Sequence, residues 1–74
     1  MEVVWEAELD NKYNCKVLRL GAYHGCLMIT DNLGKILTQK PVTISFDARF
    51  GPDVDDVELW QDMCVEYVDS LGEN

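Results

Sequence analysis

The sequence has no basic residue after Arg49. Residues 1–52 contain six basic and six acidic side chains and are neutral overall, whereas residues 53–74 contain the other eight of the fourteen acidic side chains. The whole net charge of −8 therefore lies in the last third of the chain. Because phosphate contacts require Lys and Arg, we do not expect direct binding to nucleic acid or to an anionic membrane.

Long hydrophobic runs are also missing. The longest is Cys26–Ile29, against the roughly 20 residues that a membrane-spanning helix needs. The stretch Met1–Glu6 has no basic start and is interrupted by acids, unlike a signal peptide. We therefore expect a cytoplasmic protein that does not enter a membrane.

Cysteine is scarce and irregularly spaced. Cys15, Cys26 and Cys64 form an odd set, which is not typical of a secreted disulfide scaffold, and we expect them to be reduced and mostly apolar in role. With His24 they offer enough ligands for one zinc ion, but structural zinc sites use closely spaced pairs such as C-x₂-C. We expect no metal and no other cofactor.

Catalytic patterns are absent as well. His24 is the single histidine, and no third group is evident that would orient it against a cysteine nucleophile. A glycosidase-type acid needs an apolar pocket, whereas most acids here fall on one helix face. The segment 53–58 lacks the loop glycine of an EF-hand. The sequence therefore predicts a protein that is not an enzyme.

The composition that is present, 47% hydrophobic and 27% charged, is typical of one folded domain spanning residues 1–74. Alternation of apolar residues predicts strands over 3–9, 13–20, 26–30 and 35–46. Residues 10–12 and 31–34 have turn chemistry, and 21–25 reads as a loop or tight turn. Because every connection is short, the strands should be antiparallel neighbours, giving a β-meander over 1–50.

Two features of this meander affect strand geometry. Residues 13–20 place Tyr13, Cys15 and Val17 on one face but Leu18 and Leu20 on the other, so either a β-bulge near Val17–Leu18 or burial on both faces is required. Pro41 has no amide hydrogen, which places the fourth strand at a sheet edge or breaks it there.

A helix is predicted over residues 53–71, ending before Gly72. Asp53 is a plausible N-cap, and a start at Asp55 with Glu58 at the third helical position is the alternative. At 100° per residue one face of this amphipathic helix is apolar and should pack on the sheet. Its members are Val57, Trp60, Cys64, Tyr67, Val68 and Leu71.

The opposite face is a stripe of carboxylates within about 80° of arc, with no base between them. Its members are Asp55, Glu58, Asp62, Glu66, Asp69 and Glu73. This stripe predicts a docking surface for a basic partner, and the alternative is a solvated face kept acidic for solubility. Leu59 and Met63 lie beside it, either extending the docking edge or packing against the rim of the sheet.

Two segments carry a resemblance to known proteins. Trp5-Glu6-Ala7-Glu8-Leu9-Asp10, and Phe50-Gly51-Pro52-Asp53-Val54-Asp55-Asp56-Val57 followed by Trp60-Gln61, resemble small uncharacterised proteins of phage and prophage genomes. Those proteins share the plan of strands followed by a short C-terminal helix. The resemblance implies a non-enzymatic protein that binds and modulates a host factor, and it assigns no functional residue.

Together these observations predict an α+β domain: an antiparallel meander of about four strands with one C-terminal helix on one face. The expected function is a protein-interaction module whose acidic helix face, with Leu59 and Met63, docks on a basic partner, as a phage-type modulator or nucleic-acid mimic. The alternative is a small structural protein that self-associates through an edge or face of its sheet. The sequence leaves the oligomeric state open.

Overall fold

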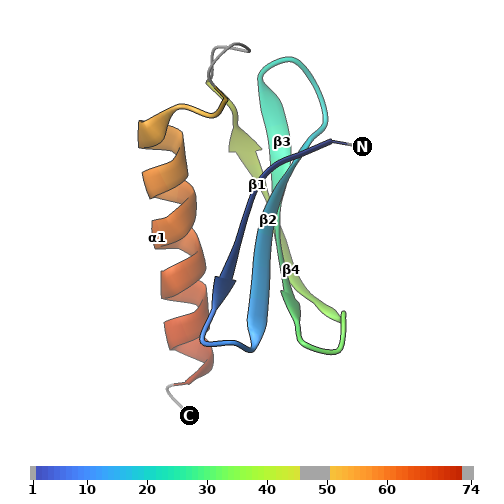
Figure 1. The fold of residues 1–74 in the computed structure, drawn as a ribbon, viewed down its shortest axis with the longest axis vertical. Helices are drawn as coiled ribbons and strands as arrows, with labels where there is room; N and C mark the ends of the chain where they lie inside the picture. The colour runs from blue at the N-terminus through green and yellow to red at the C-terminus, as the bar shows by residue number, and fades with distance from the viewer. Residues whose placement is uncertain (1, 46–50, 73–74) are drawn as a thin grey trace.

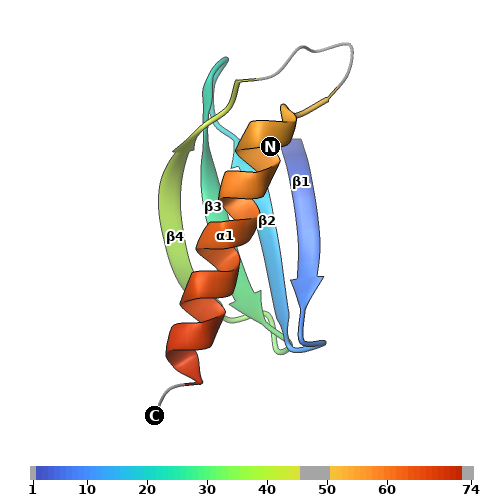
Figure 2. The ribbon, with the colours of Figure 1, turned by 90° about the vertical axis from the view of Figure 1, so that its left-hand side faces the viewer.

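The fold is a four-stranded antiparallel meander with one helix on one face (Figure 1). The computed structural model describes residues 2–45 and 51–72. The elements are β1 (Glu2–Leu9), β2 (Tyr13–Arg19), β3 (His24–Asp31), β4 (Ile36–Thr43) and α1 (Val54–Leu71). The sheet order is β1-β2-β3-β4, and α1 crosses in front of the sheet when viewed from the helix side (Figure 2). The predicted α+β class is confirmed.

Two turns set the strand register as their residue types predict. After β1, Asp10 and Asn11 both have φ of 56°, and Lys12 N donates to Leu9 O at 3.1 Å. Asp and Asn tolerate this left-handed conformation better than other non-glycine residues. Between β3 and β4, the Asp31 carboxylate accepts hydrogen bonds from the turn backbone, and Gly34 has φ of 86°.

The bounds of two strands, β3 and β4, differ from the prediction by more than one residue. β3 begins at His24 rather than Cys26, because the preceding loop closes tightly: Leu20 N and Gly21 N both donate to His24 O, at 3.0 and 3.1 Å. β4 ends at Thr43, which pairs with the first residue of β3, so no partner strand extends further. The predicted end of the fourth strand, Phe46, lies outside the described residues.

The extra residue in the β1–β2 ladder lies in β1, opposite Val17–Leu18, and it leaves the alternation of β2 unchanged. Val3 pairs with Leu18 and Trp5 pairs with Val17, which leaves Val4 as the bulge. β2 itself alternates regularly and buries Cys15 and Val17 under α1. A bulge therefore does lie at Val17–Leu18, but its extra residue belongs to β1 and does not bring Leu18 to the buried face. Burial on both faces is not found either, since Leu18 is only half-buried and Leu20, just beyond β2, is exposed.

The helix begins and ends where its caps predict. The Asp53 carboxylate accepts a hydrogen bond from Asp55 N at 2.8 Å, and Gly72 N donates to Asp69 O at 3.1 Å. Asp53 is thus the N-cap, and the alternative start at Asp55 is wrong. Acids in the first turn also complement the positive end of the helix dipole.

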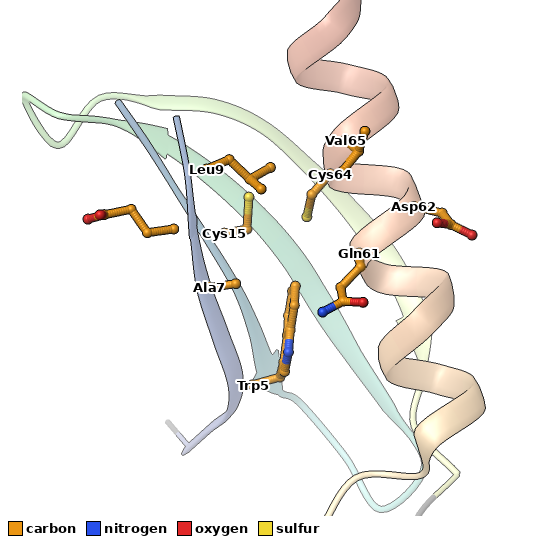
Figure 3. Close-up of a pocket in the computed structure, with 9 residues that line it drawn as sticks. Trp5, Ala7, Leu9, Cys15, Gln61, Asp62, Cys64 and Val65 are labelled. Carbon is orange, nitrogen blue, oxygen red and sulfur yellow. The ribbon is translucent and has the colours of Figure 1, made fainter. Parts of the chain in front are cut away.

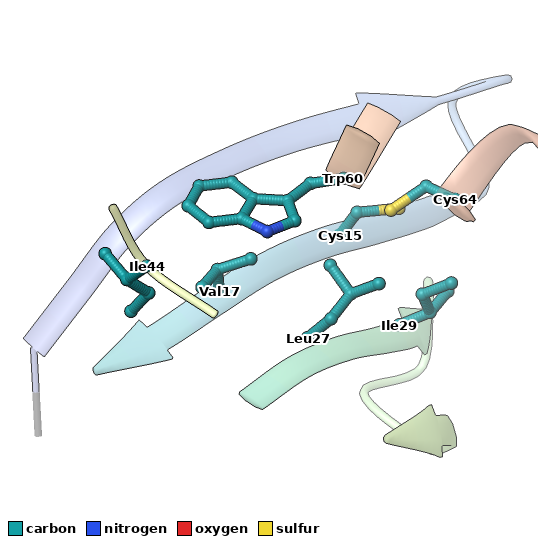
Figure 4. Packing of buried hydrophobic residues seen from close by; sticks show 7 residues of the cluster. All are labelled: Cys15, Val17, Leu27, Ile29, Ile44, Trp60 and Cys64. Carbon is teal, nitrogen blue, oxygen red and sulfur yellow. The ribbon is translucent and has the colours of Figure 1, made fainter. Parts of the chain in front are cut away.

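The core lies between α1 and the inward face of the sheet (Figure 4). Its fully buried members are Cys15, Val17, Leu27, Ile29, Ile44, Trp60 and Cys64. Trp60 is the largest, and its ring centroid lies 6.0 Å from that of Trp5 on β1. A buried aromatic of this size removes about 150–250 Å² from water, so Trp60 is the principal anchor of α1. Tyr67 adds a hydrogen bond to Leu37 O at 3.2 Å.

Candidate interaction surfaces

The acidic face of α1 is a row of exposed carboxylates. We define it by the described residues Asp55, Glu58, Asp62, Glu66 and Asp69, all exposed. Glu73, also predicted in the stripe, lies outside the described residues. From Asp55 to Asp69 the row extends about 21 Å at 1.5 Å per residue, so one negative charge occurs about every 5 Å.

The remaining two acids at the start of the helix have structural partners instead. Asp53 caps α1, and Asp56 accepts a hydrogen bond from Ser45 N at 2.6 Å, which joins the end of the sheet to the first turn of the helix. The five acids of the acidic face form no such contact among the described residues. The structure therefore separates acids that hold the fold from acids that only face solvent.

Bases that could neutralise the acidic face are located elsewhere. In the described part of the chain, Lys16 Nζ lies 3.9 Å from Glu6 Oε2 and Arg19 Nε lies 3.2 Å from Glu2 Oε1, both across strands of the sheet. No such ion pair is described for α1, and its last turn has no basic residue. Like charges three and four residues apart repel by about 0.2–0.5 kcal/mol per pair, so packing must hold α1 against its own charge.

The two apolar residues predicted beside the stripe have different surroundings. Leu59 is 57% exposed and lies next to the acidic face, whereas Met63 is half-buried and packs against the core. On the other flank Val65 is 45% exposed, a residue that the sequence reasoning missed. The sequence signal that could have identified Val65 is its position three residues after Asp62, because residues at this spacing are neighbours on the surface of a helix.

Val65 also lines a cavity of about 360 Å³ between β1 and α1 (Figure 3). Trp5 and Leu9 form its sheet side, Cys15 and Cys64 its floor, and Asp62 lies on the helix side with its carboxylate directed away. The remaining lining residues are Ala7, Glu8 and Gln61. An apolar floor beside carboxylates can receive an apolar side chain from a partner whose surrounding surface is basic.

The Cys15 and Cys64 thiols face each other in this floor (Figures 3 and 4). Burial raises the pKa of Cys64 to about 12, with the neighbouring Cys15 thiol adding to the rise. Burial also raises the pKa of Cys15. Both thiols are therefore protonated near neutral pH, which is the unreactive form of cysteine. All three cysteines are free in the structure.

The residues considered for zinc do not converge. Cys15 and Cys64 are buried between sheet and helix, whereas Cys26 lies on the opposite face of the sheet, next to exposed His24. Over residues 2–45 and 51–72, no three His, Cys, Asp or Glu side chains come together as a metal site. Over the same residues, α1 is too polar to cross a bilayer.

Comparisons with known proteins add no relatives: no family model, curated protein or solved structure matches this chain. The resemblance to phage and prophage proteins therefore stays a prediction. Functional inference depends on the surfaces themselves.

Proposed function

We propose that this chain is a non-enzymatic protein-interaction module whose acidic face docks on a basic surface of a partner protein. The observation that carries the proposal is the row of five exposed carboxylates on α1, none paired with a base among the described residues. Matched charge of opposite sign on a partner steers association and fixes register. Leu59 and Val65, exposed on the two flanks, supply apolar contacts at the rim of this face.

The partner class that best fits the row is a protein surface that normally binds a phosphate backbone. The acidic face has one charge about every 5 Å, compared with one per 3.4 Å along each strand of B-DNA. The row thus has the sign of a single phosphate strand and a charge spacing about one and a half times as wide. The resemblance to phage and prophage proteins supports the same proposal, because it implies a modulator of a host factor.

The proposal is tested by capturing the partner from a host lysate on the immobilised protein and then measuring the affinity of the purified pair. Two variants each remove three acids and leave a net charge of −5: D55N/D62N/D69N on α1 and E2Q/E6Q/E8Q on β1. The β1 variant also removes the ion pairs of Glu2 with Arg19 and of Glu6 with Lys16. We expect the α1 variant to bind at least about tenfold more weakly and the β1 variant to bind nearly as wild type.

A nucleic-acid competitor separates the two parts of the proposal. Single-stranded DNA should displace the protein from the partner if the occupied surface is a phosphate-binding one. If the protein stays bound in the presence of DNA, the partner surface that it occupies is basic but is not a phosphate-binding one. Equal affinities of the two variants would contradict the docking role of α1.

A further inference from the structure

The face of the sheet opposite α1 is uncovered by any described part of the chain (Figure 1). Because Cys15, Val17, Leu27 and Ile29 point toward α1, the residues that alternate with them point away from it. We define the outer patch as Leu18, Leu20, Cys26, Met28 and Ile36, which surround a hollow of about 300 Å³ together with Gln39.

The outer patch departs from the usual pattern of a half-covered sheet. An antiparallel sheet with one free face normally carries polar residues there. Here Leu20 is 55% exposed and Ile36 is 49% exposed. Leu18 on β2 pairs with Cys26 on β3, which in turn pairs with Pro41 on β4, so apolar residues are neighbours across three strands. Single exposed apolar residues are ordinary, whereas a contiguous patch marks an interaction surface.

The edges of the sheet are poorly suited to association. β1 carries a bulge at Val4 and the acids Glu2, Glu6 and Glu8, while β4 contains Pro41 and a register shift near Leu37. Bulges, charges and proline are the devices that block edge-to-edge pairing. Association through the sheet must therefore use the outer face and not an edge.

The charge distribution indicates what covers this face. On the outer side Lys16 offsets Glu6 beside it, and Glu8 is the further acid of β1 on that side, so the charge next to the patch is small compared with that of the acidic face. All the acids of the acidic face lie on the other side of the molecule. Two copies stacked through their outer faces would keep the two acidic faces about 30 Å apart, several Debye lengths at physiological salt.

The available area suits a weak dimer. Strands of seven or eight residues in a four-stranded sheet present a face of about 500 Å², so two copies would bury about 1,000 Å² in total. That is the lower limit for a specific interface. We propose that two copies of this chain associate through their outer patches into a two-sheet sandwich with both acidic faces outward.

The test compares two equally exposed leucines on opposite sides of the molecule. Leu20→Lys places a charge in the outer patch, and Leu59→Lys is the matched control on α1, where the wild-type residue is 57% exposed. Both changes reduce the net negative charge, so a loss of association in Leu20→Lys cannot come from greater repulsion. Sedimentation velocity is run on wild type and both variants from about 5 to about 500 µM, the range over which a weak dimer dissociates.

We expect wild type and Leu59→Lys to shift from 8.5 kDa toward twice that mass with concentration, and Leu20→Lys to stay at 8.5 kDa. Because the Debye length is about 30 Å at 0.01 M salt, raising the salt from there to about 0.15 M should strengthen the dimer by screening repulsion between copies. A wild type that stays monomeric, a Leu20→Lys variant that dimerises like wild type, or a dimer broken by Leu59→Lys would each overturn the proposal.

Cys26 gives an independent measurement of the same face. It is the least buried of the three cysteines, and Cys15 and Cys64 are shielded in the core. Native alkylation by iodoacetamide, followed by mass spectrometry, should modify Cys26 several-fold more slowly at the highest protein concentration than at the lowest. A rate that does not depend on protein concentration would contradict burial of Cys26 in the dimer.

Discussion

The acidic face of α1 and the outer face of the sheet lie on opposite sides of one small domain and have opposite chemistry. The helix side presents five carboxylates with no described base among them, while on the sheet side Lys16 balances Glu6 next to an apolar patch. Fold stability alone requires neither arrangement. The contrast indicates that the two sides serve different contacts, one electrostatic and one apolar.

The same contrast exists among the acids themselves. Asp53 and Asp56 bind backbone amides and hold the start of α1, so their position follows from the fold. Asp55, Asp62 and Asp69 have no comparable contact in the described residues, and their alignment costs self-repulsion along the helix. Acids that repel one another along the helix and have no side-chain partner among the described residues are candidates for a role outside the chain.

Removing Trp60, the anchor of α1, should have the largest effect, because it separates the buried side of the helix from its exposed side in their contribution to stability. Trp60→Ala deletes a fully buried indole that packs on Trp5, and we expect it to lower the free energy of unfolding by about 3–5 kcal/mol. Leu59→Ala, next to it on the exposed side, should change stability by less than about 0.5 kcal/mol. Urea unfolding followed by circular dichroism measures both. A cooperative Trp60→Ala transition near the wild-type midpoint would contradict the anchoring role.

Alkaline pH should weaken the contact between helix and sheet through the paired thiols. In the unfolded chain Cys64 ionises above its ordinary pKa of 9.0, whereas in the folded chain it stays protonated up to a pKa of about 12. Between pH 9 and 12 the unfolded state therefore binds fewer protons, and the free energy of unfolding falls as the pH rises.

The substitution Cys64→Ala isolates this contribution. Its free energy of unfolding should fall less steeply than that of wild type between pH 9 and 12. Urea titrations at several pH values supply the slopes. Identical slopes for wild type and Cys64→Ala would mean that this thiol is not protected in the folded state.

Neutralising the acidic face should stabilise the fold slightly. The triple variant D55N/D62N/D69N removes every like-charge pair at three- or four-residue spacing within the acidic face. The loss of this repulsion should stabilise the fold by about 0.8–2 kcal/mol. The loss of Asp55 from the first turn costs about 0.3–1 kcal/mol of helix-dipole energy, so the midpoints of the two ranges give a net gain of about 0.8 kcal/mol. Thermal unfolding at low salt measures it, and a lower midpoint would show that these acids stabilise the fold.

Much of the fold could be predicted from local sequence. The turns and helix caps are short-range signals, because their residues form hydrogen bonds or adopt backbone angles within the same turn or cap. These residues are Asp10, Asn11, Asp31, Gly34, Asp53 and Gly72. The four strands and the buried face of α1 followed from periodicity. These features depend on residues close together in the chain, where side-chain type decides backbone geometry.

What the sequence could not supply depends on pairing between distant segments. The apolar residues on both faces of β2 suggested a bulge, but only the register with β1 shows that the extra residue is Val4 and that Leu18 stays on the outer face. Similarly, nothing local indicates that Cys15 meets Cys64, or that Leu18, Leu20 and Ile36 gather around one hollow. The acidic face could be found because one helix contains it, whereas the outer patch is assembled from three strands and a loop.

The most direct test of the account is the salt dependence of partner affinity for the wild-type protein and for D55N/D62N/D69N. If the acidic face docks by charge, wild-type affinity should fall at least about tenfold between about 50 and about 500 mM salt, mainly through slower association. The triple variant should start weaker and show a much shallower dependence. Equal affinities with no salt dependence in either protein would contradict the account, because the acidic face would then be a solvated surface.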